Sequence, residues 1–515
     1  MDPVELSLWL FKKRGEFIQL ATEDPGLPEP FGNRPFSHGE YDLEQIEKVR
    51  SPQLPESASF VIIGSGITGC SVAHTLLHNE AFKDKNVVVL EARELASGAT
   101  GHSAGQLATA SFKDWADIAK VEDKKTAKEV AEFSYENLRR LDKLVNQQPA
   151  LVKEYTKFKR LTMITNLLTQ EIRAQSEPLE LAFRQSCDEL GDLWQYKDAE
   201  YAEDSYWFRK TQGVLEGPGA SLQPGKLVAG IFKDLLAKFP FRLRIETRTP
   251  VKTVEDNTES TSHPCLVITD RGPIKASHII YCVNGWTSHL LPHLKGSIFP
   301  IPGTVTKYDL SIAPPNVSNK YTWTMVNLPS VDVKTNVIDT GRDSITQELD
   351  TNDFSVRGEL LHLRGVVPKP MTNVDSTNVS YRKHHTIMKS AFSAEKLAAS
   401  DQVSSSDDSS PSEPTVKARW TSLMAFTPDL FPLVGCLPAE VTDRKEGGEW
   451  IAAGCDGNGL DKCWLMGEAI VNMIKNGDAS IPSCYLTTDD RLDNLDPGDF
   501  LPRWLRQDTY EPYDP

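Results

Sequence analysis

The sequence predicts an α/β protein built on a doubly wound, Rossmann-type parallel sheet, and three observations lead to this. An apolar run of strand character at 60–63 feeds directly into a glycine-rich turn at 64–69. Apolar residues then recur at helical spacing over 72–77, and a second β-branched run follows at 87–89. An acidic residue, Glu91, closes that second strand. Strand, glycine turn, helix, strand and acid in this order form the first βαβ unit of a dinucleotide-binding sheet.

Each position of the turn GSGITG has a mechanical role. Gly64 allows the tight turn, Gly66 lets a pyrophosphate approach the backbone, and Gly69 lets the helix pack closely on the strand. The helix N-terminus, with Ile67 and Thr68, offers N–H groups and a partial positive charge to phosphates. Glu91 can accept hydrogen bonds from a ribose. These residues therefore predict a dinucleotide site, and the alternative is a glycine-rich turn in an ordinary α/β sheet.

Length and charge limit the possible classes of protein. A chain of 515 residues is too long for one small core, so we expect two or three lobes. Apolar residues make up 39% and charged residues 25%, which is typical of a soluble globular protein. The net charge of −16 argues against a nucleic-acid partner, because phosphate binding needs a basic face. A cationic small substrate remains compatible with this charge.

The cysteines and the apolar runs favour a cytoplasmic protein. None of the eight cysteines forms a CxxC pair or shows metal-ligand spacing, so we expect buried free thiols and a reducing compartment. No segment has eighteen uninterrupted apolar residues, so we expect no membrane span. The first residues resemble neither a secretory signal nor a transit peptide.

Periodicity and turn signals predict the remaining elements. Helical spacing of apolar residues predicts helices at 120–146, 171–190, 224–237 and 460–475. Apolar and β-branched runs predict strands at 242–246, 265–269, 278–283 and 449–453. Gly-Pro-Gly at 217–219 and Asp-Arg-Gly at 270–272 predict turns. The serine-rich run at 399–415 predicts a disordered surface insertion.

Five segments, in order along the chain, carry a resemblance to a known family. They are GSGITG with 91–93, then 96–101 (ASGATG), 217–227, 276–286, and 420–435 followed by 454–464. On these segments the chain resembles the FAD-dependent oxidoreductases of the D-amino-acid oxidase, glycine oxidase and sarcosine oxidase family. It looks closest to the fungal γ-glutamylputrescine-oxidase-like branch. The resemblance covers roughly residues 20–480.

The resemblance implies two lobes assembled from discontinuous segments. One lobe would hold FAD in the doubly wound sheet, and the other would place a mixed sheet and helices over the flavin as a substrate domain. The expected FAD-binding segments are 58–119, 215–299 and 416–480. The expected substrate-domain segments are 120–214 and 300–398. An extended N-terminal arm at 1–57, with a short helix near its start, and a C-terminal tail at 481–515 complete the division.

Most of the residues that the resemblance assigns to FAD lie in the five segments, whereas His102, Gly105 and Gln106 follow the second segment and Val251 lies between the third and the fourth. The assigned residues are Gly64, Gly66, Ile67, Thr68, Gly69, Glu91, Arg93, Ser97, Gly98, Thr100, Gly101, His102, Gly105, Gln106, Val251, Asn284, Gly285, Thr427, Asp429, Gly454, Gly457, Gly459 and Leu460. The last segment also has a direct physical interpretation. Gly457 and Gly459 let backbone come close to a flat ring, and a helix starting near Leu460 would aim its positive end at that ring. The alternative is a glycine-rich turn that caps a packed helix.

Four departures from the family pattern bear on the chemistry. His102 resembles the histidine that sarcosine and dimethylglycine dehydrogenases attach to the flavin, so it is either a covalent anchor or a hydrogen-bonding residue beside the ring. Asp461 stands where sarcosine oxidases carry a lysine, and an acid there would attract an ammonium group. Arg364 is either a substrate anchor or a solvated strand residue. Ser422 replaces a usual glycine.

The resemblance implies an enzyme that oxidises a C–N bond of an amine or amino acid to an imine by hydride transfer to flavin. Oxygen or another acceptor would then reoxidise the flavin. The candidate catalytic residues are His102, Asp461 and Arg364, and no metal is expected. Two alternatives stay open. One is an FAD-bound protein that no longer turns over and acts in binding or assembly, and the other is flavin-dependent oxidation of a biosynthetic intermediate.

Overall fold

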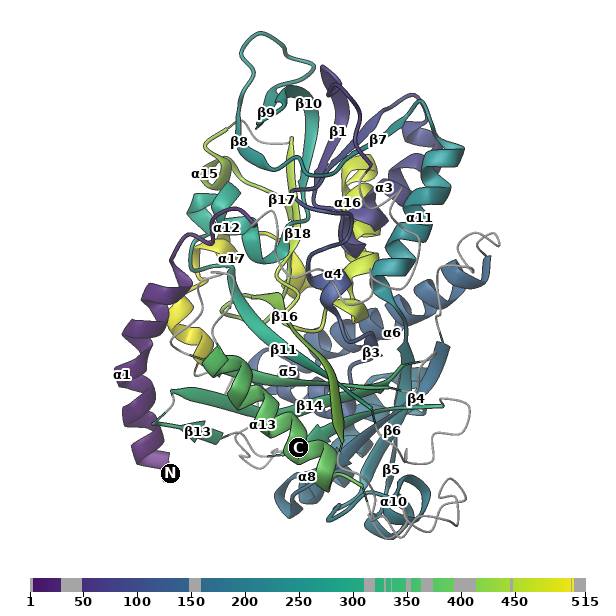
Figure 1. Cartoon of the computed structure of the whole chain (residues 1–515), viewed down its shortest axis with the longest axis vertical. Helices are drawn as coiled ribbons and strands as arrows, with labels where there is room; N and C mark the ends of the chain where they lie inside the picture. Colours follow the sequence, from purple (N-terminus) through teal and green to yellow (C-terminus); the bar gives the residue numbers. More distant parts are fainter. Residues whose placement is uncertain are drawn as a thin grey trace.

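Two large β-sheets and the helices that cover them make up the fold (Figure 1). The computed structural model describes residues 3–28, 49–147, 159–309, 320–327, 330–334, 336–348, 353–362, 374–392, 414–444, 448–501 and 503. The first sheet and its helices occupy the upper half of Figure 1, and the second sheet lies in the lower half. Among the described residues, no helix combines the length and the apolar character needed to cross a membrane.

The first sheet is the doubly wound sheet expected from the sequence. Its order is β17-β18-β10-β1-β2-β7, and four neighbouring pairs, from β18–β10 to β2–β7, are parallel. The bounds are β1 (Ser57–Ile63), β2 (Val87–Leu90), β7 (Leu243–Glu246), β10 (Gly272–Tyr281), β17 (Leu433–Cys436) and β18 (Glu449–Ala453). Because β1, β2 and β10 are parallel and in register, their carboxyl ends meet at one edge.

Both faces of this sheet are buried, which explains the unbroken apolar strands. Phe60 and Ile62 of β1 pack toward three helices on one face, whereas Val61 and Ile63 pack in the core of the other face. The helices are α3 (Ile67–His78), α11 (Pro224–Lys238) and α16 (Cys463–Asn476). The other face is covered in part by β8 (Val251–Asp256) and β9 (Cys265–Thr269), which continue the sheet through β10 as an antiparallel meander.

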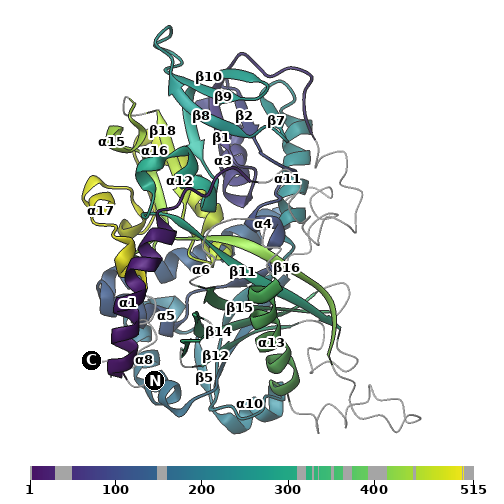
Figure 2. The same ribbon diagram turned by 60° about the vertical axis from the view of Figure 1, so that its left-hand side comes forward.

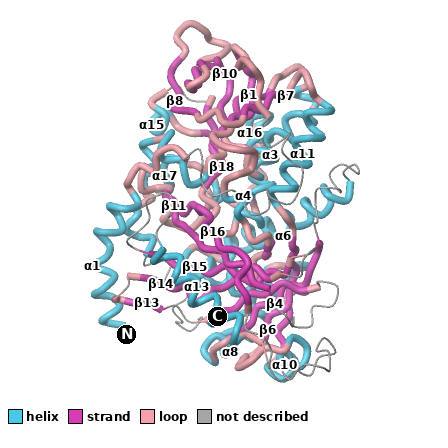
Figure 3. Tube along the Cα trace, viewed as in Figure 1, coloured by secondary structure: helices cyan, strands magenta, loops and turns pink. Residues whose placement is uncertain are grey.

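The second sheet is mixed and larger. Its order is β16-β11-β15-β14-β12-β4-β6-β3, and the β12–β4 pair is parallel whereas the other pairs along this order are antiparallel. The bounds are β3 (Gln106–Ala108), β4 (Lys159–Leu167), β6 (Val214–Ser221), β11 (Phe299–Asp309), β12 (Tyr321–Val326), β14 (Val337–Gln347), β15 (Phe354–His362) and β16 (Thr415–Phe426). The short strands β5 (Gln195–Lys197) and β13 (Ser330–Asp332) pair with β6 and β14. Figure 3 shows these strands crossing the lower half of the molecule.

Helices cover both faces of the second sheet as well. Met163 of β4 packs in a core with α5 (Phe112–Val121), α6 (Lys124–Gln147) and α8 (Gln170–Ser186). Its neighbour Ile164 belongs to a second core that includes residues of α10 (Ala199–Tyr206) and α13 (Val374–Ser390). Successive strand residues thus face opposite cores, as the two-residue period of a strand requires.

Most predicted elements are confirmed, with shifted ends. The helix expected at 120–146 is two helices, α5 and α6, and the one at 171–190 is α8 followed by α9 (Asp188–Gly191). The turn at 270–272 is confirmed, since Gly272 pairs with Thr269 at the start of the β9–β10 hairpin. The last helix begins at Cys463 rather than near 460, because a 3₁₀ turn, Gly459–Asp461, precedes it.

The turn predicted at 217–219 is wrong. Gly217, Pro218 and Gly219 lie within β6 and pair with Met163, Thr162 and Leu161 of β4. Gly217 is there because a β-carbon would overlap the indole of Trp194, so the glycine permits a close approach within a strand. Strands β3, β6 and β16 belong to the second sheet, although the expected segmentation placed their residues with the FAD-binding lobe.

The N-terminal segment contains more helix than expected. α1 (Pro3–Ala21) runs for 19 residues, and Figure 2 shows it along one side of the molecule. Its Phe17 is fully buried and stacks on Phe500, and it also packs edge-on to Phe299. The arm expected at 1–57 is therefore anchored by a helix. The expected insertion at 399–415 lies outside the described residues up to 413, and its last residue, Thr415, begins β16.

A buried histidine links α13 to the second sheet. His384 is fully buried, and its Nδ1 lies 2.9 Å from the hydroxyl of Thr306 on β11. Burial, aided by the nearby Lys383 ammonium, lowers the pKa of His384 to about 3. The neutral imidazole is therefore the folded form throughout the neutral and weakly acidic range.

This burial predicts an acid-sensitive contribution to stability. The unfolded chain takes up a proton at His384 below about pH 6.5, whereas the folded chain does so only near pH 3. The contribution is complete above pH 6.5 and is lost as pH falls, by about 2 kcal/mol at pH 5. We expect His384→Gln to reduce the difference in free energy of unfolding between pH 7 and pH 5, measured by urea unfolding. His263→Gln, a substitution near the surface, is the control, and an equal pH dependence in both variants would contradict the assignment.

Candidate active site

A large cavity lies between the two sheets. Its empty volume is about 1740 Å³, including the part open to solvent. At one end it is lined by the glycine turn and the end of β2, and at the other by residues of β11, β14, β15 and β16. The segment 455–463 forms another wall. The cavity thus connects the predicted dinucleotide site with the second sheet.

Sixteen of the predicted site residues line this cavity. They are Gly64, Gly66, Ile67, Thr68, Glu91, Arg93, Gly98, Thr100, His102, Gln106, Val251, Asn284, Gly457, Gly459, Leu460 and Asp461. The predicted residues Gly69, Ser97, Gly101, Gly105, Gly285, Thr427, Asp429 and Gly454 are not part of its lining. Arg364 lies outside the described residues.

The glycine turn has the geometry that its spacing predicts. Gly64 adopts a φ of +106°, and a β-carbon there would overlap the carbonyl of Cys282. A β-carbon on Gly69 would overlap the carbonyl of Gly64, so this glycine serves the packing of α3 rather than the cavity. Gly66 precedes the first residue of α3, and the Ile67 N–H donates to the Thr100 hydroxyl at 3.0 Å. Gly66, Ile67 and Thr68 line the cavity, with the Ile67 N–H already bound to Thr100.

Glu91 is held in place at the end of β2. One carboxylate oxygen accepts hydrogen bonds from the N–H and the hydroxyl of Ser65, at 3.1 and 2.6 Å. The other accepts from the Arg93 N–H at 3.0 Å. Arg93 stacks its guanidinium over the ring of Trp286, 5.1 Å from the ring centroid. Together with Val251, these residues line the cavity near the carboxyl ends of the parallel strands.

His102 ends the short helix α4 (Ala99–His102) and is buried. Its Nδ1 lies 3.0 Å from the carbonyl oxygen of Gly98, which can only accept, so Nδ1 carries the proton. The indole N–H of Trp420 donates to the His102 carbonyl at 2.8 Å. Gln106 donates from its amide to the Thr322 hydroxyl and the Trp323 carbonyl, which ties this loop to the second sheet.

The segment 455–463 brings backbone to the cavity wall. Gly457 has a φ of +77°, and a β-carbon there would meet the guanidinium of Arg357 at 3.0 Å. Asn137 of α6 binds the backbone on either side of the start of α16. Its amide donates to the Leu460 carbonyl and accepts from the Leu465 N–H. The segment is therefore held from the second lobe as well as by its own fold.

Asp461 lines the cavity but does not present an isolated negative charge. The ammonium of Lys462 lies 2.7 Å from one of its oxygens, and the Ser134 hydroxyl donates to the other at 3.3 Å. Both charged residues are buried. Although burial disfavours the ammonium, the adjacent Asp461 carboxylate raises the pKa of Lys462 above its usual value. The expected attraction of Asp461 for a cationic substrate is thus largely offset by Lys462, which the sequence analysis did not consider.

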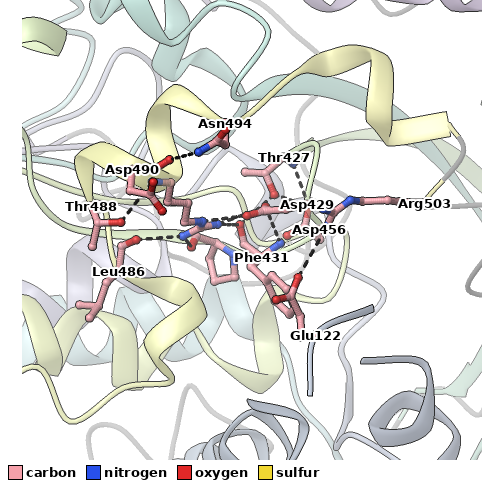
Figure 4. A network of polar contacts seen from close by, with 12 residues as sticks. Glu122, Thr427, Asp429, Phe431, Asp456, Leu486, Thr488, Asp490, Asn494 and Arg503 are labelled. Atoms are coloured by element: carbon pink, nitrogen blue, oxygen red, sulfur yellow. Dashed lines mark hydrogen bonds and ion pairs between the residues drawn. The ribbon is translucent and has the colours of Figure 1, made fainter. Parts of the chain in front are cut away.

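Thr427 and Asp429 form a structural network instead of a cavity wall (Figure 4). Asp429 binds Arg491 with both carboxylate oxygens, at 2.8 and 3.2 Å. The Thr427 hydroxyl donates to the Phe431 carbonyl, and the Thr427 N–H donates to Asp456. The polar groups of this turn are therefore satisfied within the protein.

Arg357 is a charged cavity residue that was not predicted from the sequence. It is half-buried on β15, where it pairs in register with Ser344 and Val305, and all three line the cavity. Arg364, the candidate anchor expected from the sequence, follows a few positions farther along the chain. No motif marks Arg357, because a single cation in an alternating strand has no sequence signature of its own.

The described residues fit a flavin dinucleotide. The glycine turn lines the cavity through Gly64 and Gly66, and the positive end of α3 opens onto the same space through Ile67 and Thr68. In the wall formed by 455–463, Gly457 and Gly459 contribute positions without side chains. The cavity extends from the first sheet to the second, which suits a cofactor with a nucleotide at one end and a ring at the other.

Comparisons with known proteins agree with this geometry. Residues 59–473 match the family model described as DAO, FAD dependent oxidoreductase. No match was found among curated protein sequences. Among solved structures, glycine oxidase from Geobacillus kaustophilus has a TM-score of 0.58 at 15% identity, with 84% of this chain and 99% of that chain covered.

Two further structures are similar in fold. L-amino acid deaminase from Proteus vulgaris has a TM-score of 0.58 at 14% identity, covering 87% of this chain and 98% of the other. L-proline dehydrogenase from P. horikoshii has a TM-score of 0.57 at 17% identity, covering 87% and 99%. The family match spans most of the chain. The chain therefore belongs to the DAO family of FAD-dependent oxidoreductases.

Proposed function

We propose that the protein oxidises the C–N bond of a small amine that carries a carboxylate, giving an imine that water hydrolyses. The observation that carries this proposal is Arg357, a cation on the second sheet that faces the cavity beside Gly457. Similar structures are named glycine oxidase, L-amino acid deaminase and L-proline dehydrogenase, and these names support a substrate of the amino-acid class.

A guanidinium is suited to anchor a carboxylate. Its planar, permanently charged group binds carboxylates with two parallel hydrogen bonds, which fixes orientation as well as position. Arg357 lies beside the backbone of Gly457, where a β-carbon would meet its guanidinium at 3.0 Å, so a substrate bound to it would lie where the second sheet meets the flavin-side wall. Arg357 takes in this proposal the anchoring role that the sequence analysis gave to Arg364.

The remaining residues of the site position and shield the substrate. FAD, when bound, supplies a two-electron acceptor for hydride. Val305 and Met424 contribute apolar surface at the substrate end, and both are buried, so they exclude water from the reacting carbon. Because hydride leaves from carbon and the amine nitrogen needs only to be unprotonated, we assign no general base. The Asp461–Lys462 pair keeps this part of the wall polar but nearly neutral.

The proposal also covers the electron acceptor, the length of the substrate and the location of the protein. Oxygen or another acceptor would take the electrons from the reduced flavin. The resemblance to the γ-glutamylputrescine-oxidase-like branch favours a substrate with a longer aliphatic amine in addition to a carboxylate. The cysteine content favours the cytoplasm as the location.

The direct experiment is anaerobic reduction of the bound flavin. A panel of amino acids, N-methylated amino acids and matched amines is added to the flavin-loaded protein, and loss of visible absorbance is followed. We expect bleaching by at least one carboxylate-bearing amine. Failure of the whole panel would contradict the proposal and favour the alternative of an FAD-bound protein that does not turn over.

The role of Arg357 is tested by a matched pair of ligands. Arg357→Met removes the cation but keeps a long apolar side chain, and loss of a charge-assisted contact corresponds to about 1.5–3 kcal/mol. We therefore expect the Kd for a carboxylate-bearing substrate to rise about 10- to 100-fold, measured by flavin absorbance titration. The Kd for the amine that lacks the carboxylate, such as pyrrolidine against proline, should change little. An equal effect on both ligands would refute the anchoring role.

Acid precipitation distinguishes the two roles predicted for His102, covalent attachment of the flavin and hydrogen bonding beside its ring. Its ring is already oriented by the Gly98 carbonyl, and its own carbonyl holds Trp420, so a place beside the flavin needs no covalent bond. We expect the flavin to leave with the supernatant, and His102→Ala to weaken FAD binding in an apoprotein titration. Flavin retained in the pellet of the unsubstituted protein, and released from the variant, would instead establish His102 as the attachment residue.

A further inference from the structure

Two cysteines that the proposed reaction does not use face each other in the cavity wall. Cys455 follows β18, Cys463 is the first residue of α16, and their sulfur atoms are 3.4 Å apart. Each side chain is less than a tenth exposed, and both line the cavity. The two thiols are therefore in direct contact in the wall of the cavity.

The surroundings of the two thiols differ. Cys463 lies at the N-terminus of a 14-residue helix and directly follows Lys462, and both features favour a thiolate. The hydrogen bond from the Cys455 thiol, together with one from Thr68, lowers the pKa of Cys463 although burial opposes this. For Cys455 the same hydrogen bond and burial raise the pKa well above its usual value. Cys463 is thus the nucleophile of the pair, and Cys455 is the resolving thiol.

Most of the seven residues between the two cysteines line the cavity. Gly457, Gly459, Leu460 and Asp461 all line the cavity. The chain reverses there through left-handed backbone at Asp456 (φ 49°) and Gly457 (φ +77°). A bond between the ends of this segment would close it into a small ring.

We propose that Cys455 and Cys463 form a reversible disulfide in response to a peroxide, and that this bond fixes the segment 456–462 in the flavin-side wall. The Cys463 thiolate attacks one oxygen of hydrogen peroxide, which breaks the O–O bond and gives a sulfenic acid and hydroxide. The hydroxide takes up a proton, equivalent to the one that the Cys463 thiol released, and becomes water. The Cys455 thiol then attacks the sulfenic sulfur and displaces a second water. Two thiols are oxidised and one peroxide is reduced to two waters, and a dithiol can reduce the disulfide back to two thiols.

The proposed bond would affect the cavity wall because Cys455 and Cys463 flank the segment 456–462. A disulfide bond of about 2.05 Å is shorter than the present separation, so its formation requires the two side chains, or the backbone that carries them, to move together. Asp461 and Lys462 lie next to Cys463 and would move with it. Peroxide would arise in this cavity if oxygen reoxidises the flavin. Only this source of peroxide rests on the proposed function, because the reaction of the two cysteines with added peroxide does not depend on it.

The test uses the purified, flavin-loaded protein and added hydrogen peroxide, without substrate. After alkylation and digestion, mass spectrometry should find one peptide pair joined through Cys455 and Cys463. The free thiols in denaturant should fall from eight to six, and dithiothreitol should restore them. The flavin absorbance or fluorescence should change on oxidation and recover on reduction. Sulfinic acid at Cys463 without a disulfide, or a bond from Cys463 to Cys282, would overturn the proposal.

Variants separate the two steps. Cys455→Ser should stop at a sulfenic acid on Cys463, which dimedone traps, and Cys463→Ser should lose the linked peptides altogether. Cys436→Ser, at a half-buried cysteine outside the cavity lining, is the matched control and should behave as the unsubstituted protein. A disulfide that forms with no change in the flavin signal would refute the effect on the wall. A protein that forms the disulfide but is bleached by no amine would refute the proposed function alone.

Discussion

The close approach of α3 to the end of β1 determines most of the remaining architecture. It depends on Gly69, because any side chain there would overlap the carbonyl of Gly64. With α3 in this position, α16 can cross it at Gly467, where a β-carbon would meet Ser71 at 2.6 Å. The Ser71 hydroxyl in turn donates to the Trp464 carbonyl at 2.6 Å. The start of α16, and with it the flavin-side wall, is therefore positioned through the same glycine turn that shapes the dinucleotide end.

Features that depend on local order along the chain could be predicted from the sequence. The first βαβ unit, Glu91 after β2 and the hairpin at 270–272 all follow from neighbouring residues, and the structure confirms them. Gly217–Gly219 could not be predicted correctly, because the same residues suit a turn or a strand packed against an indole. Only the distant Trp194 distinguishes the two possibilities.

In the candidate site, too, features set by neighbouring residues could be predicted, and features that depend on distant residues could not. Motif residues at the dinucleotide end line the cavity, but Asp429 pairs with Arg491, which lies 62 residues away in sequence and outside the matched segments. Asp461 was recognised without Lys462, its immediate neighbour, because the sequence alone does not show that both side chains are buried together. Arg357 depends on which face of β15 meets the cavity, and the pairing of that strand is non-local.

Asn137 makes the two lobes interdependent. This residue belongs to α6, which packs under the second sheet, yet its amide bridges the Leu460 carbonyl and the Leu465 N–H on the flavin side. A carboxamide can donate and accept at once, so no charged or apolar residue of similar size would reproduce both bonds. Exchange of one lobe for that of a relative would separate this amide from its two backbone partners. Chimeras of this fold therefore require α6 and α16 to be transferred as one unit.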